Sequence, residues 1–94
     1  MDVKVKYYAT AWEATGKRSE VIALRTGSTI KELIHVLTEQ YGKPLSTYML
    51  NEGGDPTDYL TYFVGGINVH SLKGFDTELN NGDTAVIAPT IVGG

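Results

Sequence analysis

Residues 29–42, TIKELIHVLTEQYG, predict the one long helix around which the fold is organised. Apolar residues recur at positions 30, 33, 34, 37 and 41, a spacing that places them in one stripe of a helix with 3.6 residues per turn. Thr29 and Glu32 fit a capping box, in which each side chain accepts a hydrogen bond from the other's backbone amide. Gly42 and Pro44 are expected to end the helix. One apolar stripe of this width fits across one face of a sheet.

Strand patterns precede this helix. In residues 3–7 apolar side chains alternate with lysines, which is typical of a strand with one buried face. A turn of helix or a wide loop is expected over residues 9–18, followed by a second strand at about 19–25. The two faces of that second strand carry Val21 with Ala23 and Ile22 with Leu24. Because both pairs are apolar, both sides of the strand are predicted to be partly covered.

Turns and strands alternate after the helix. Residues 51–58, NEGGDPTD, predict an exposed loop because they are rich in the residues that favour turns. The further expected elements are a strand at 59–64, a Gly65-Gly66 turn, a strand at 67–69, a turn at 80–83 and a strand at 84–88 that Pro89 ends.

The order strand, strand, helix, strand, strand, strand predicts an α+β fold. A mixed sheet of about five strands, with one main helix packed across one face, is the β-grasp arrangement, although periodicity alone also allows other split arrangements. The 94 residues suffice for one domain. We expect it at residues 1–89, followed by a flexible tail at 90–94.

Composition excludes several kinds of function. The chain has no Cys, which excludes disulfides, thiolate metal sites and a cysteine nucleophile. Its net charge of -3 argues against nucleic-acid binding, which needs clustered Lys and Arg. Residues 1–8 lack the apolar run of a signal peptide, and no apolar stretch is long enough to cross a bilayer. These features predict a cytoplasmic protein with no membrane attachment.

Charge is distributed unevenly along the sequence. Residues 51–94 contain six acidic residues against Lys73 alone, whereas residues 1–50 carry most of the Lys and Arg. A solvated acidic face is the plain interpretation. If a partner docks on the C-terminal half, its surface is expected to be basic.

Other polar residues form no convincing site. His35 and His70 lie far apart without the spacing of metal ligands, and Asp55 and Asp58 lack further alternating ligands. Gly65-Gly66 lacks the strand-to-helix context and the Lys of a phosphate-binding loop. The sequence therefore predicts neither a metal site nor a catalytic residue.

The C-terminal sequence resembles that of a known family. Asn81-Gly82-Asp83, the strand at 84–88, Pro89 and a final Gly93-Gly94 together resemble the C-terminal block of the MoaD/ThiS family. Upstream, residues 3–9 and 27–33 resemble that family's first strand and helix start, so the resemblance covers nearly the whole chain. It implies a ubiquitin-like sulfur carrier of the MoaD or ubiquitin-related-modifier branch.

This resemblance implies a role for the C-terminal carboxylate of Gly94. In the family, an adenylating enzyme uses ATP to convert this carboxylate into an acyl-adenylate, from which a thiocarboxylate or an amide forms. The chain would then be a co-substrate with no bound cofactor of its own, and not an enzyme. Thr90, Ile91, Val92 and Gly93 would thread the partner's active site.

Three functions follow from this resemblance. The first is the small subunit of molybdopterin synthase in molybdenum cofactor biosynthesis, with the adenylating enzyme and the large synthase subunit as partners. The second is a protein modifier joined through Gly94 to lysines of other proteins. The third is a β-grasp interaction domain with an inert tail.

The chemistry explains why such a tail would end in glycines. A carboxylate is ionised at neutral pH and is a poor electrophile, so it needs activation. Glycines have no side chain that would block a narrow channel. The body would dock through the sheet face opposite the helix, where Tyr8, Val86 and Ala88 are expected to form a small apolar patch. The alternative is that both faces of the central strands are simply covered.

Overall fold

The structure is a computed structural model and describes residues 1–91 of the chain. In chain order the elements are β1 (Asp2–Tyr7), α1 (Thr10–Thr15), β2 (Ser19–Ala23), α2 (Ile30–Tyr41), α3 (Lys43–Met49), β3 (Leu60–Val64), β4 (Ile67–Asn68) and β5 (Thr84–Pro89). Two short 3-10 helices, Val69–Ser71 and Gly74–Asp76, lie between β4 and β5. No helix in the described residues is long and apolar enough to cross a membrane.

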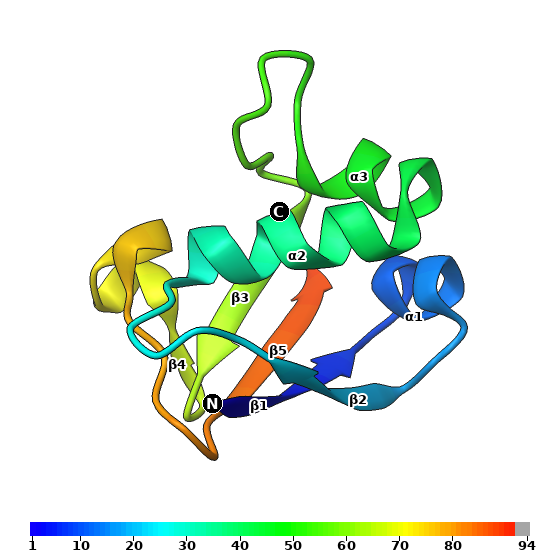
Figure 1. Ribbon diagram of the computed structural model, residues 1–94. Coiled ribbons are helices and arrows are strands. Elements are labelled where there is room, and N and C mark those ends of the chain that lie inside the picture. Colours follow the sequence, from blue (N-terminus) through cyan, green and yellow to red (C-terminus); the bar gives the residue numbers. More distant parts are fainter. Residues whose placement is uncertain (92–94) are drawn as a thin grey trace.

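Within residues 1–91, five strands form one mixed sheet of order β2-β1-β5-β3-β4. The central strands β1 and β5 are parallel, and the other neighbouring strands are antiparallel. Helix α2 crosses one face of this sheet, and α1 and α3 pack beside it (Figure 1). The predicted α+β fold of the β-grasp type is therefore confirmed.

Helix α2 forms as its sequence predicts. The Thr29 side chain caps its first turn by accepting a hydrogen bond from the Glu32 amide at 3.4 Å, which is one half of the expected capping box. At the other end Gly42 adopts a φ of 67° and donates to the Thr38 carbonyl at 2.9 Å. The buried residues of the helix are Ile30, Leu33, Ile34, Leu37 and Thr38. This stripe faces the sheet.

The prediction for Pro44 is wrong. Helix α3 begins at Lys43, directly after Gly42, and Pro44 occupies its first turn, where a missing amide costs no intrahelical hydrogen bond. Gly42 alone ends α2. Leu45 and Met49 of α3 are fully buried, so this segment adds to the core.

The prediction that both sides of β2 are partly covered is correct for one side and wrong for the other. Ile22 and Leu24 are buried beneath α2, but Val21 on the other face is 64% exposed. Strand β2 lies at the edge of the sheet, and the helices cover only one face. The opposite face of β2 is therefore open.

The predicted hairpin after the 51–58 loop is confirmed. Gly65 and Gly66 form its turn with φ values of 58° and 79°, the left-handed conformation that a tight turn between twisted strands requires. Val69, expected in the second strand, instead lies in a 3-10 helix and is fully buried.

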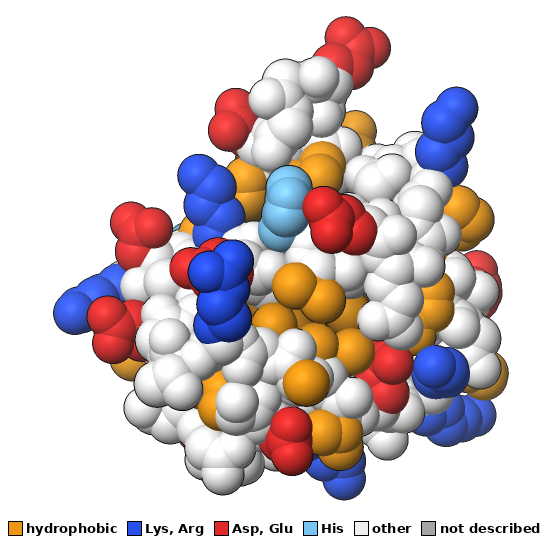
Figure 2. All heavy atoms as spheres, in the orientation of Figure 1, with side chains coloured by type: hydrophobic (Ala, Val, Ile, Leu, Met, Phe, Trp, Pro, Cys, Tyr) orange, Lys and Arg blue, Asp and Glu red, His pale blue; other side chains and the backbone are white. Residues whose placement is uncertain are grey.

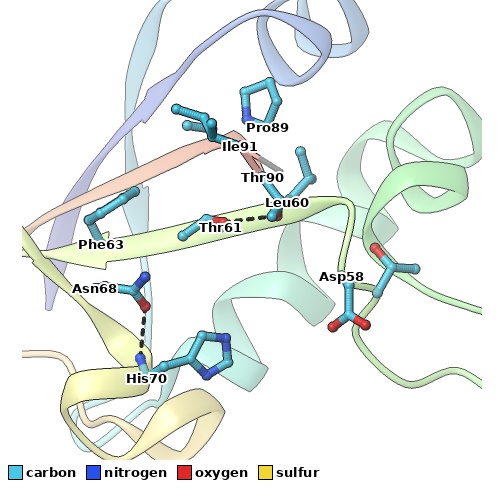
Figure 3. A pocket seen from close by; sticks show the side chains of 11 residues that line it. Asp58, Leu60, Thr61, Phe63, Asn68, His70, Pro89, Thr90 and Ile91 are labelled. Carbon is cyan, nitrogen blue, oxygen red and sulfur yellow. Dashed lines mark hydrogen bonds between the residues drawn. The ribbon is translucent and has the colours of Figure 1, made fainter. Parts of the chain in front are cut away.

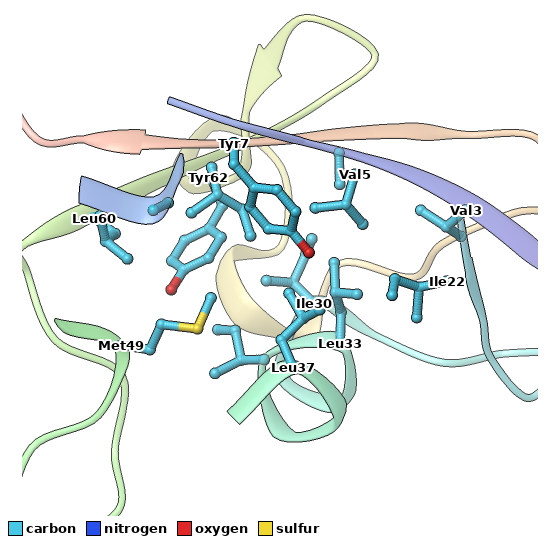
Figure 4. Packing of buried hydrophobic residues seen from close by; sticks show 14 of the residues in the cluster. Val3, Val5, Tyr7, Ile22, Ile30, Leu33, Leu37, Met49, Leu60 and Tyr62 are labelled. Carbon is cyan, nitrogen blue, oxygen red and sulfur yellow. The ribbon is translucent and has the colours of Figure 1, made fainter. Parts of the chain in front are cut away.

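The core lies between the sheet and α2, as Figure 4 shows. Inward side chains of β1 meet the buried stripe of α2, and the ring of Tyr62 on β3 packs edge-on against Phe75 at 5.8 Å. Each fully buried Leu, Ile or Val side chain stabilises the fold by about 1.5–3 kcal/mol. The β1 residues in this core are Val3, Val5 and Tyr7.

Candidate functional site

Strand β5 carries the root of the C-terminal tail. Its last residue, Pro89, pairs with Leu60 on β3. The Thr90 amide then donates to the Tyr59 carbonyl at 3.0 Å, and the hydroxyls of Thr90 and Thr61 lie 2.9 Å apart. Ile91 is 92% exposed. The hydrogen bonds of the body thus extend to Thr90, one residue beyond the predicted boundary at residue 89.

A surface hollow of about 520 Å³ lies beside this root (Figure 3). Its lining comes from the 51–58 loop, β3, the segment after β4 and the tail itself. The residues that define it are Asp58, Thr61, Phe63, His70, Ala88 and Thr90. Ile91, although 92% exposed, borders this hollow too.

The hollow contains no catalytic dyad. Its two ionisable side chains, Asp58 and His70, come from separate segments and form no ion pair with each other. Within residues 1–91 no three His, Asp or Glu side chains lie close enough together to hold a metal ion. The described part of the site is thus a surface hollow beside the tail root, with Asp58 and His70 as its ionisable side chains.

The predicted docking residues lie on one face of the sheet. Ala85 and Ile87 are buried, so Val86 and Ala88 point to the opposite side, where both are half-buried. Tyr8 continues β1, donates its amide to the Ile87 carbonyl at 3.0 Å and is 52% exposed. The structure therefore brings Tyr8, Val86 and Ala88 together at the end of the sheet from which the tail leaves.

Sequence analysis missed one residue of this face. Phe63 on β3 is the cross-strand partner of Val86 and lines the hollow at the tail root. Its alternation with the buried Tyr62 indicated an outward position. That β3 neighbours β5 could not be predicted, because strand order is a property of the fold.

Charge around this face is not uniformly acidic. The acidic residues of the C-terminal half form two groups, one in the 51–58 loop and one in the segments before β5. Because β3 pairs antiparallel with β5, the loop before β3 lies at the end of β5, whereas the second group precedes its start. The residue beside Val86 on β1 is Lys6. The central apolar strip is thus flanked by a cation and not by a continuous acidic surface.

The remaining predicted site residues are Val92, Gly93 and Gly94. They lie outside the described residues.

Two relatives share much of this sequence. A protein of Archaeoglobus fulgidus that is named as a sulfur carrier protein is 36% identical over 66 residues, which cover 70% of this chain and 74% of that protein. Small archaeal modifier protein 3 of Haloferax volcanii is 24% identical over 94 residues, and the alignment covers the whole of both chains.

Solved structures share the fold. The crystal structure of small archaeal modifier protein 1 from Haloferax volcanii superposes with a TM-score of 0.85 at 17% identity, over the whole of both chains. The solution structure of the Methanosarcina acetivorans protein of that name has a TM-score of 0.79 at 28% identity, covering 99% of this chain and 96% of its own. A Pyrococcus furiosus protein named as subunit 1 of a molybdopterin converting factor has a TM-score of 0.76 at 25% identity, covering 96% and 98%.

The family model described as the ThiS family matches residues 5–94, which include the second half of β1, the long helix, the tail root and the final glycines. This match agrees with the family resemblance of the C-terminal block. The chain belongs to the ThiS family.

Proposed function

We propose that this chain is a ubiquitin-like carrier protein whose Gly94 carboxylate is activated by an ATP-dependent adenylating enzyme and converted to a thiocarboxylate. In this proposal it delivers sulfur as the small subunit of a molybdopterin synthase. The name of the Archaeoglobus relative supports the sulfur carrier, and the name of the Pyrococcus protein supports the molybdopterin assignment. The chain is a co-substrate, and the chemistry takes place in its partners' active sites.

The observation that carries the proposal is the geometry of the tail root. Thr90 is held by β3 and Ile91 is almost fully exposed, so the chain leaves the body directly after a fixed point. The four residues from Ile91 to Gly94 span at most about 14 Å when extended. Such a segment can enter a narrow channel while the sheet face around Val86 rests on the enzyme surface.

In the activation step a carboxylate oxygen of Gly94 attacks the α-phosphorus of ATP and pyrophosphate leaves. A hydrosulfide ion from the sulfur donor then attacks the acyl carbon of the adenylate, AMP leaves with the electron pair of the broken C–O bond, and Gly94 carries a thiocarboxylate. Glycine at both final positions keeps side chains out of the path of these reactants.

Protein modification is the second candidate. The full-length match to a small archaeal modifier protein favours it, as does the structure of the Methanosarcina modifier. The same acyl-adenylate would serve both functions, with a lysine amine of a target protein as the nucleophile in place of sulfur.

Intact mass spectrometry tests the two candidates. The full chain is incubated with its adenylating enzyme, ATP and a sulfur donor. A mass increase equal to the exchange of one oxygen for one sulfur supports the carrier, and Gly94-linked branched peptides in a tryptic digest of cell extract support the modifier. A chain with one Ala appended after Gly94 is the control and should give neither product. Products from that control, or none from the native chain, would contradict the proposal.

A further inference from the structure

The outer edge of β2 presents free backbone hydrogen-bonding groups. The Leu24 amide donates to the Met1 carbonyl at 2.8 Å, and the Met1 amino group donates to the Leu24 carbonyl at 2.8 Å. In an antiparallel pair such bonded positions recur at every second residue. At the other end of the pair, the Tyr7 amide donates to the Arg18 carbonyl at 2.9 Å. Both ends therefore agree on which alternate residues of β2 are bonded to β1.

This phase fixes which groups face outward. Residues 18, 20, 22 and 24 direct their amides and carbonyls towards β1, so Val21 and Ala23 direct theirs away from the sheet. Strand β2 is the last strand of the sheet, and no described segment pairs with this edge. Unprotected edges of this kind template the addition of another strand.

A groove of about 390 Å³ runs beside this edge, between β2 and α2. We call it the β2 groove. Leu24 and Val36 contribute its apolar surface, and the polar residues that line it include Arg25, Lys31, Glu32 and His35. Figure 2 shows hydrophobic side chains at the surface between α2 and β2, with charged side chains around them.

The two faces of an added strand would meet different surfaces. Side chains on the helix side would enter the β2 groove and contact Leu24 and Val36. Those on the other side would lie against Val21, which is 64% exposed. An occupant that fits both surfaces has consecutive apolar residues and an extended backbone.

Charge specifies one further property of the occupant. Arg25 and Lys31 form no ion pair within residues 1–91, whereas His35 at the same groove lies 3.4 Å from Glu39. Glu32 lies in the first turn of α2, where the helix dipole stabilises its charge. The free cations therefore favour an acidic residue beside the apolar run.

We propose that the edge of β2 and the β2 groove bind an extended segment of a partner protein, composed of three or four apolar residues next to an acidic one, as a sixth strand. Strand β1 separates this edge from β5 and its tail. The proposal goes beyond the carrier function, because a partner at this edge can stay bound while the tail enters an enzyme.

The probes are synthetic hexapeptides, titrated into the isotope-labelled full chain and followed by NMR. Each contains three residues drawn from Val, Ile and Leu in all combinations, preceded by Thr and followed by Asp-Asp. We expect the best binder to shift the amide signals of Val21, Ala23 and Val36. It should also slow hydrogen exchange at the amides of Val21 and Ala23.

Two variants test the mode of binding. Val21→Pro removes an outward amide that no strand within residues 1–91 uses, so it should keep the fold and weaken binding about tenfold. Val21→Thr is its matched control and should bind within about twofold of the native chain. Arg25→Glu should weaken the Asp-Asp peptide about threefold or more, and should favour the same peptide ending in Lys-Lys.

Several results would overturn the proposal. They are the absence of binding by every peptide, shifts confined to β3 and β5, or equal binding by Val21→Pro and Val21→Thr. If Val21→Pro fails to fold, the shift map and the charge reversal at Arg25 decide the question. Concentration-dependent dimerisation in which the Val21 and Ala23 amides become protected would instead assign the edge to a second copy of this chain.

Discussion

The hydroxyl of Tyr7 donates a hydrogen bond of 2.5 Å to a carboxylate oxygen of Glu20. The hydroxyl of Tyr41 donates to the same oxygen, and the Lys17 ammonium lies 3.4 Å from the other. Burial raises the pKa of Tyr7, as does its hydrogen bond to Glu20, so its hydroxyl remains a donor. One carboxylate thus joins β1, β2 and the last turn of α2.

Removing this carboxylate should destabilise the fold. Glu20→Ala leaves the buried Tyr7 hydroxyl without its acceptor, a loss of about 1–3 kcal/mol in the free energy of unfolding. Urea denaturation followed by circular dichroism measures it. Glu52→Ala, at an exposed loop residue, is the control and should change stability by less than about 0.5 kcal/mol. Equal effects of the two variants would show that the Glu20 contacts contribute nothing.

The same carboxylate predicts a pH dependence. Burial alone would raise the pKa of Glu20, but hydrogen bonds from Tyr41 and Tyr7 and the nearby Lys17 ammonium outweigh it and hold the pKa below its ordinary value. A lowered folded-state pKa means that the stabilisation is present above the unfolded value of about 4.3 and is lost as the pH falls through the folded-state value. The difference in Tm between the native chain and Glu20→Gln should therefore be largest near neutrality and should shrink as the pH falls below about 4.3. A difference that does not vary with pH would contradict this linkage.

A comparison of these contacts with the cap of α2 shows which features of the fold the sequence could predict. The Thr29 cap and the stripe of α2 are local, so their spacing predicted them correctly. Glu20 meets Tyr7 and Tyr41 only because an edge strand lies beside the end of α2, and no local pattern shows that. Helix α3 was missed for another reason: its two buried residues, Leu45 and Met49, are too few to show a period.

The candidate site, too, was predictable where it depends on local sequence and unpredictable where it depends on strand order. The tail root and the outward positions of Val86 and Ala88 followed from alternation in one strand. The outward position of Lys6 likewise followed from alternation in β1, whereas Phe63 depends on strand order, which brings β3 beside β5. Long-range pairing therefore supplies the β3 part of the docking face, which sequence analysis lacked.

Ala9 should gain stability from replacement by glycine. Its φ of 50° and ψ of -118° lie in a region that side chains with a Cβ disfavour, and no other non-glycine residue among residues 1–91 has a positive φ. Ala9→Gly relieves this strain at the cost of extra unfolded-state entropy, for a net gain of about 1 kcal/mol. Thermal denaturation measures the change. The control Ala14→Gly, within α1, should lose about 1 kcal/mol. Destabilisation by both variants would mean that Ala9 is unstrained.

Val86 should contribute to recognition by the adenylating enzyme. It lies between Lys6 and Phe63 on the open face, so a carboxylate there would disrupt an apolar contact. Val86→Glu should lower kcat/KM for activation about 30-fold, mainly through KM, with little change in Tm. Thr84→Glu places the same charge on the same face of β5, two residues further from the tail, and should change kcat/KM less than threefold. Similar losses in both variants would indicate general charge repulsion.

The length of the tail should limit activation more strictly than its side chains do. Thr90 is fixed by β3, so only the residues after it can reach into a partner, and each spans at most about 3.5 Å. Deleting Ile91 draws the Gly94 carboxylate back by that distance, and a misplacement of even about 1 Å can cost 100-fold in rate. Ile91→Ser keeps the length and changes only an exposed side chain, so it should retain activity within about threefold. Pyrophosphate release measures both variants. If the Ile91 side chain matters and the length does not, Ile91→Ser will be the inactive variant, and the proposed threading of the tail will be wrong.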